Sequence, residues 1–400
     1  MDKNEKIIDL QNKVIDRLML LIDEDDFFRS CLEESIIKAY GTVSDPEWNP
    51  IRNIDDYIKF ISRALMSYPW EICSQHIYPS LYERINQGMG ALYFVTDQPL
   101  DRLSGKDYYH NSLMYYPPFA EWFDLFLKVN GDFLDSPESW NEKCLEFALS
   151  QNDFHLKDGT YENPENWHSF NDFFARHLSS PGRRPVASGS KNVVMPADAV
   201  VYGVWDIDDR GNVLMGGDEG IIDELQIKTG QYRRIEELLA NDQYSRDFYG
   251  GKLIHMMLDI NDYHRYHFPV SGEIIEIKKI DGITAPGGVM KWDENRHLYV
   301  EYLSESFSWQ AIETRGLILV DTGDHGKVAI LPVGMCQVSS VYIEPQLSVG
   351  IHVEKGDPLG CFYFGGSDIV IVFEKKADFE QGTELKKHML VGECVGKFNN

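Results

Sequence analysis

The apolar residues of the first 165 positions recur at helical spacing. In residues 119–127, bulky side chains stand at i, i+3, i+4, i+7 and i+8, the stripe that one face of a helix buries. Residues 7–22 and 55–66 repeat this pattern. Ser136-Pro137-Glu138 offers a cap residue, a proline and an acid, as at a helix start. We therefore expect a helical domain over residues 1–165.

After Val193 the pattern changes to short β-rich segments between Gly and Asp turns, of which residues 272–280 are one example. Only one short helix is expected among them, near residues 235–240. Because strands then follow one another directly, the pattern favours an antiparallel α+β arrangement over a doubly wound sheet. The polar, turn-rich residues 156–167 mark the boundary, so the second domain is expected over residues 166–400.

Charge and cysteine usage narrow the class of protein. Lys and Arg number 38 against 64 Asp and Glu, a net charge of −26, which argues against nucleic acid or an anionic lipid surface as the main partner. The N-terminus lacks the apolar segment of a signal peptide, and no early apolar run approaches a membrane span. The six cysteines include no CxxC pair. We expect reduced thiols, no transmembrane segment and a cytoplasmic location.

Three segments carry candidate chemistry. Asp198 follows a proline after an apolar run, His264 and His267 lie in DYHRYHFP, and Ser367 follows two glycines in FGGSD. Taken singly, each segment has an ordinary structural explanation, either a turn or a histidine whose ring is hydrogen-bonded within the fold. The two histidines provide two metal ligands without an evident third, so no metal is expected.

Together the three segments could form a catalytic triad. Ser367 would be the nucleophile, His267 the base and Asp198 the residue that orients the base. The G-x-S-x-G turn of the α/β-hydrolases is absent. A serine hydrolase built on another fold is therefore one open interpretation.

The same segments resemble the motifs of the phosphatidylserine decarboxylase family, whose members cleave themselves to form a pyruvoyl group. The matching pieces, in family order, are FNDFFARHL with RRPV, VMPADAV, DYHRYHFPVSG, LPVGMCQVSS and VEKGDPLGCFYFGGSD. The resemblance implies a β-rich antiparallel catalytic domain of this family's type. The helical first half and the FGGS junction are similar to a soluble branch, which includes the fungal tryptophan decarboxylase of psilocybin biosynthesis.

The resemblance also implies roles for single residues. Ser367 would become the pyruvoyl cofactor after a break between Gly366 and Ser367. His267 and His264 match the two histidines of the family's motif, and Asp198 matches its acid. The pyruvoyl group would form a Schiff base with the substrate's amine and assist loss of CO₂, and a histidine would return the proton. No metal and no added cofactor are expected.

The substrate is open at this point. The charge of −26 favours a soluble L-amino acid, aromatic ones included, over phosphatidylserine, which is the alternative. The family implies a homodimer. Ala199 and Asp368 depart from the family's pattern, and the charge of Asp368 beside the junction is expected to slow or gate processing. The hydrolase interpretation, with Asp198, His267 and Ser367, instead predicts an uncut chain that an organophosphate labels.

Overall fold

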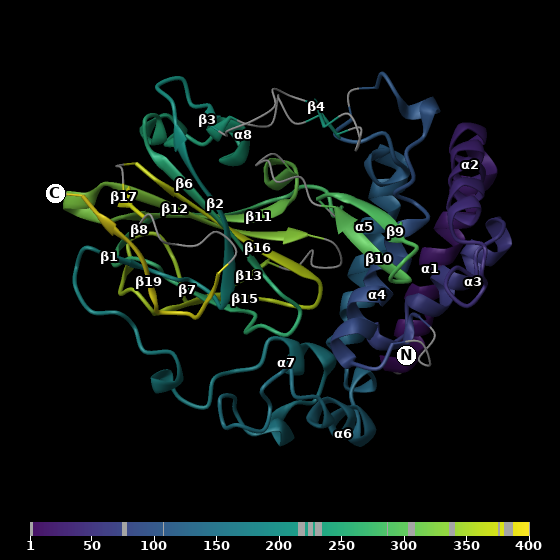
Figure 1. Ribbon diagram of the computed structural model, residues 1–400, viewed down its shortest axis with the longest axis horizontal. Helices are drawn as coiled ribbons and strands as arrows, with labels where there is room; N and C mark the ends of the chain where they lie inside the picture. Colours follow the sequence, from purple (N-terminus) through teal and green to yellow (C-terminus); the bar gives the residue numbers. More distant parts are fainter. Residues whose placement is uncertain are drawn as a thin grey trace.

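The computed structural model describes residues 3–73, 78–106, 108–214, 221–222, 227–228, 234–285, 287–302, 309–335, 341–374, 377–379 and 387–399. Helices from the first half of the chain form a layer against a β-rich body from the second half (Figure 1). The predicted α+β class, with helices first and antiparallel strands after them, is confirmed. The cysteines within these ranges are free thiols, and Cys336 lies outside the described residues.

Several helices of the first half begin at a residue whose side chain caps the first turn. The α-helices are α1 (Lys3–Glu24), α2 (Asp26–Thr42), α3 (Ile54–Ala64), α4 (Leu81–Phe94), α5 (Pro117–Leu134), α6 (Glu142–Ser150), α7 (Phe170–Phe174) and α8 (Ile235–Leu238). Asp25, Asn53 and Ser80 accept hydrogen bonds from first-turn N–H groups of α2, α3 and α4. Helix α7 is capped by Ser169, whose side chain accepts from the N–H of Asp172.

Short 3-10 helices connect these elements. They are η1 (Pro69–Glu71), η2 (Asp101–Leu103), η3 (Leu113–Tyr115), η4 (Pro137–Ser139), η5 (Pro164–Asn166), η6 (Pro181–Arg183), η8 (Ser245–Phe248), η9 (Trp309–Ala311) and η10 (Gly323–His325). The helix start expected at Ser136 leads only into η4. Trp140 then takes an extended backbone and stacks on Phe173, so the α-helix begins later, after the cap Asn141.

The second half is built from strands. They are β1 (Asn192–Val194), β2 (Ala199–Ile207), β3 (Val213–Leu214), β4 (Ile221–Ile222), β5 (Ile227–Lys228), β6 (Lys252–Leu258), β7 (Arg265–His267), β8 (Gly272–Ile280), β9 (Val289–Asp293), β10 (Leu298–Tyr302), β11 (Thr314–Asp321), β12 (Lys327–Met335), β13 (Val341–Ile343), β14 (His352–Val353), β15 (Pro358–Phe362), β16 (Gly366–Phe373), β17 (Ala377–Asp378), β18 (His388–Met389) and β19 (Cys394–Phe398). Within the described ranges, the largest sheet has nine strands in the order β14-β8-β11-β12-β16-β6-β2-β18, with β3 paired to β2.

Strand β16, which contains the candidate serine, lies in the interior of this sheet. It pairs antiparallel with β12 on one side and β6 on the other. Gly366 stands opposite Met335, and Ser367 stands opposite Gly334 and Leu258. Both edges of the strand are therefore occupied from its second residue onward.

The two faces of the sheet belong to different cores. Ile369 and Ile371 pack in a cluster with the smaller sheets, whereas Val370 packs in the cluster that includes the helices. Because side chains alternate between the faces of a strand, Ser367 points to the first face and Asp368 to the helical face.

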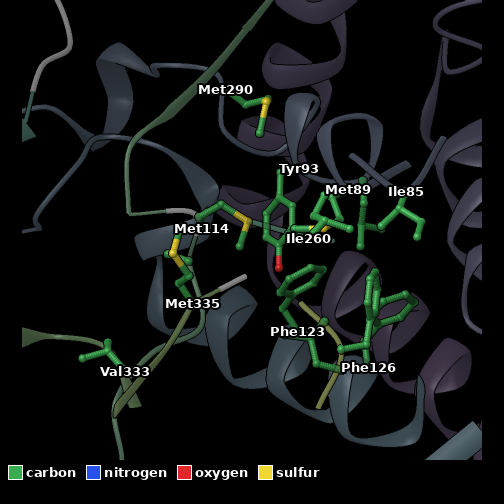
Figure 2. Close-up of a cluster of buried hydrophobic side chains, with 14 of the residues drawn as sticks. Ile85, Met89, Tyr93, Met114, Phe123, Phe126, Ile260, Met290, Val333 and Met335 are labelled. Atoms are coloured by element: carbon green, nitrogen blue, oxygen red, sulfur yellow. The ribbon is translucent and has the colours of Figure 1, made fainter. Parts of the chain in front are cut away.

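The helical layer and the sheet share one continuous core. Figure 2 shows Tyr93 of α4 and Phe123 of α5 gathered with Met290 of β9 and Met335 of β12. Since Met335 pairs with Gly366, this core reaches the end of β16 where the candidate junction lies. The boundary at residues 165 and 166 stays a prediction, because buried side chains from both halves belong to the same cluster.

Helix α4 also contacts the β9–β10 hairpin closely. The side chain of Gln87 donates to the carbonyl of Tyr299 at 3.0 Å and accepts from its N–H at 2.7 Å. One turn on, a Cβ added at Gly90 would overlap the side chain of Tyr299. Gly90 therefore allows the helix and the hairpin to approach.

We expect Gly90→Ala to lower the free energy of unfolding by about 1–3 kcal/mol, because the added methyl group overpacks this contact. Gly131→Ala in α5 is the matched control, since a Cβ there meets no atom within 4 Å. That change should add up to about 1 kcal/mol through helix propensity. Urea unfolding of both variants measures the difference, and equal stabilities would contradict the close contact.

Candidate functional site

The backbone before Ser367 is held in a bend. Gly365 has φ of 142°, a conformation that favours glycine. Just before it, the N–H of Phe364 donates to the side-chain oxygen of Asn171 in α7 at 3.0 Å, and the Phe364 ring packs edge-on against Phe174. Helix α7 thus fixes one side of the bend, and the strand ladder of β16 fixes the other.

His264 lies against the serine hydroxyl. Its Nδ1 is 3.1 Å from the Oγ of Ser367, and its Nε2 is 3.2 Å from the carbonyl oxygen of Ile260. A carbonyl can only accept, so Nε2 carries the proton and donates it to Ile260. In the neutral ring Nδ1 then has the free lone pair and accepts from the Ser367 hydroxyl. This arrangement places a proton acceptor on the candidate nucleophile.

Hydrogen bonds from several parts of the chain hold the turn that precedes His264. Asp262 accepts from a backbone N–H within this turn at 2.7 Å and pairs with Nε2 of His388 at 2.7 Å. The buried guanidinium of Arg176 donates to two carbonyl groups of the turn, at 2.7 and 2.9 Å. The ring of Phe174 stacks on His264 with centroids 3.9 Å apart. The imidazole therefore has little freedom to rotate.

The surroundings of His264 keep it neutral. Burial, together with the nearby charge of Arg176, lowers the pKa of His264 from 6.5 to about 3. His264 and Ser367 are both fully buried. The histidine is consequently a weak base, but its accepting form persists throughout the physiological pH range.

His267 makes other contacts than the expected one with Ser367. Its Nδ1 donates to the carbonyl of Gly356 at 2.9 Å, and its Nε2 lies 3.2 Å from the hydroxyl of Tyr263. The structure therefore differs from the predicted triad, because His264 takes the position beside Ser367. Among the described residues, no group of three or more His, Cys, Asp or Glu side chains is arranged to hold a metal ion.

Asp198 is bound to an arginine. Arg184 donates to both of its carboxylate oxygens, and the N–H of Val391 donates to Oδ1 at 2.8 Å. Asp198 acts on His267 through its charge. Burial lowers the pKa of His267, and the negative charge of Asp198 partly opposes that shift. The structure thus brings Asp198 near His267 without the hydrogen bond that a triad would need.

Asp368 has partners that sequence reasoning missed. On the helical face, Nε2 of His255 lies 2.7 Å from its Oδ2, and the amide of Gln310 in η9 lies 3.4 Å from the same atom. The rings of Tyr202 and Trp309 surround His255. The sequence did offer a signal, because Asp368 is a charged residue next to the apolar residues 369–373 of β16. That signal does not indicate which residue pairs with Asp368.

Comparison with known proteins identifies similar chains. The model of the family described as phosphatidylserine decarboxylase matches residues 170–397. "Phosphatidylserine decarboxylase proenzyme 2" of Oryza sativa subsp. japonica is 32% identical over 247 residues, 62% of this chain and 36% of that protein. "Phosphatidylserine decarboxylase proenzyme" of Fusobacterium nucleatum is 26% identical over 321 residues, 78% of this chain and 93% of that protein.

A third relative is "phosphatidylserine decarboxylase proenzyme 3" of Schizosaccharomyces pombe, 29% identical over 260 residues, 63% of this chain and 24% of that protein. The chain thus spans about a third or less of the rice and yeast relatives but nearly all of the bacterial one. These relatives carry the name of a lipid decarboxylase. The resemblance to the tryptophan-decarboxylase branch stays a prediction.

We expect the ring of His264 to show no titration between pH 5 and 8, because its pKa lies near 3. NMR of the protein with ¹³C-labelled histidine measures this, with His264→Asn to assign the signal. His388 is the internal control, since its hydrogen bond to Asp262 raises its pKa above 6.5. A transition of the His264 signal near pH 6.5 would contradict the buried neutral ring.

Proposed function

Because the chain belongs to the phosphatidylserine decarboxylase family, we propose that it cleaves itself between Gly366 and Ser367 and then acts as a pyruvoyl-dependent decarboxylase. The observation that carries the proposal is the contact between Nδ1 of His264 and Oγ of Ser367. A neutral imidazole with its lone pair on the hydroxyl is the arrangement that general-base activation of a serine requires.

Self-cleavage would use atoms that already lie together. As His264 accepts the hydroxyl proton, Oγ of Ser367 would bond to the carbonyl carbon of Gly366. The bond from that carbon to the nitrogen of Ser367 would then break as His264 passes the proton on to this nitrogen. This leaves an ester and a free amine. The bend at Gly365 favours the step, since it holds the preceding chain away from regular strand geometry.

A second step would separate the chains. Loss of the Cα proton of residue 367 expels the carboxylate of Gly366 and leaves dehydroalanine, which water converts to a pyruvoyl group and ammonia. Residues 1–366 and 367–400 would remain together, because β16 pairs with strands of the longer chain on both edges.

The residues around position 367 fit a pyruvoyl group. The site is fully buried and His264 faces it, so bulk water is kept from the group. The pyruvoyl group supplies a ketone that captures an amine and withdraws electrons as CO₂ leaves. His264 would hold or return a proton at the atoms of residue 367, and α7 would keep the ring in place.

Phosphatidylserine is the substrate that the names of the relatives favour. A soluble L-amino acid is the second candidate, because a net charge of −26 opposes approach to an anionic bilayer. Among the described helices, none is both long and apolar enough to cross a membrane. Both substrates present an α-amine next to a carboxylate, so the same chemistry would serve either.

The hydrolase interpretation is less favoured. Asp198 is committed to Arg184, and the ring nitrogen of His264 that faces away from Ser367 meets a carbonyl rather than an acid.

We expect the purified protein to show two chains by intact mass, split before residue 367, with the shorter chain bearing a reducible carbonyl. Incubation with phosphatidylserine vesicles and with a panel of L-amino acids should release CO₂ from one class. Ser367→Ala should give one uncut chain and no CO₂. A wild-type protein that stays uncut with an intact serine would refute the proposal.

The two histidines should differ in their effect on cleavage. His264→Ala should slow cleavage by about 100-fold or more, since it removes the group that accepts the hydroxyl proton. His267→Ala is the matched control and should have the smaller effect, because its partners are Gly356 and Tyr263. Mass spectra taken at intervals after cell-free synthesis give the rates. The reverse order would assign the base to His267.

A further inference from the structure

A buried carboxylate stands directly after the candidate junction. Asp368 is fully buried, and Oδ2 contacts His255 at 2.7 Å and Gln310 at 3.4 Å. Its other oxygen, Oδ1, has no hydrogen-bond partner in the structure as described. Removing a carboxylate from water carries a large desolvation penalty, which a hydrogen-bonded pair of this kind offsets only in part. The contact between Asp368 and His255 is therefore expected to add little to the free energy of unfolding.

Beyond Asp368, the Ile and Val residues nearest the junction do little to set the register of β16, whereas Phe373 at the far end packs against Phe379 and Phe398. Residues 369–373 read Ile-Val-Ile-Val-Phe. A slip of two residues would exchange Ile369 with Ile371 and Val370 with Val372, so each face of the strand would keep its character. Near the junction, hydrophobic packing consequently distinguishes poorly between the two registers, and Phe373 is the apolar residue of β16 that opposes a slip.

Self-cleavage would remove a constraint on this strand. Before the cut, residue 367 continues into the bend that Asn171 and Gly365 hold. After the cut, residue 367 becomes a chain end, and chain ends fray unless side chains tie them down. Asp368 is the first side chain beyond that end, and both of its partners belong to the longer chain.

We propose that the hydrogen bond between Asp368 and His255 fixes the register of β16 after self-cleavage and so keeps residue 367 beside His264. This inference rests on the proposed function. A two-residue slip would move residue 367 by about 6.6 Å along the strand. His264 lies within 3.1 Å of that residue, so such a slip would separate the pyruvoyl group from its proton donor. Asp368 and His255 are thus positioning residues.

The test replaces the pair in two ways. Asp368→Val with His255→Leu substitutes an apolar pair, which can pack without a buried charge and so preserve stability. Asp368→Asn keeps an oxygen that accepts from His255. Glu374→Gln is the matched control just beyond the other end of β16, where Glu374 accepts from the N–H of Lys327. Cleavage is followed by intact mass, and decarboxylation by CO₂ release with the substrate found for the wild type.

We expect the apolar pair to leave the melting temperature unchanged or higher while kcat falls by about 100-fold, because even 1 Å of misplacement has such an effect. KM should stay within about threefold of the wild type, since the pair is proposed to act on the position of residue 367 and not on the substrate. Asp368→Asn and Glu374→Gln should retain cleavage and kcat. The apolar variant should also cleave at the wild-type rate, because the bend at Asn171 and Gly365 holds residue 367 before the cut.

Three results would overturn the inference. They are wild-type kcat in the apolar variant, whatever its KM, loss of cleavage in the apolar variant, and an Asp368→Asn variant as impaired as the apolar one. The last would mean that the carboxylate takes part in the chemistry. An uncut wild-type chain would instead refute the proposed function, so the two failures are distinguishable.

Discussion

The carbonyl of Ile260 determines what the site can do. By accepting the Nε2 proton of His264, it leaves the lone pair of the ring on Nδ1, where the hydroxyl of Ser367 lies. Burial keeps the ring neutral, and Arg176 holds the turn that carries it. The chemistry proposed for the junction depends on this one choice of tautomer.

The two faces of β16 carry two different polar contacts. On one face Ser367 meets His264, and on the other Asp368 meets His255. Because the strand lies in the interior of the sheet, both contacts are held by neighbours on each edge. The helices cover one of these faces, which explains how residues from the first half of the chain share a core with the strand that carries the junction.

The features that depend on the spacing of residues along the chain could be predicted from the sequence. The contacts between residues far apart in the chain could not. Helical stripes and β-rich segments predicted the α+β class, and the ordered motifs predicted the family. The choice between two histidines three residues apart depends on which one the turn at Asp262 directs toward Ser367. Likewise, the partner of Asp368 lies 113 residues away on another strand. Neither contact leaves a local pattern in the sequence.

The interior position of β16 has a consequence for the cleaved protein that we propose. If the fragment of residues 367–400 dissociated, β12 and β6 would each lose a partner and the sheet would split into two parts with bare edges. Fragments would therefore not exchange between molecules under native conditions. Each molecule would keep for its lifetime the reactive group that it made from its own serine.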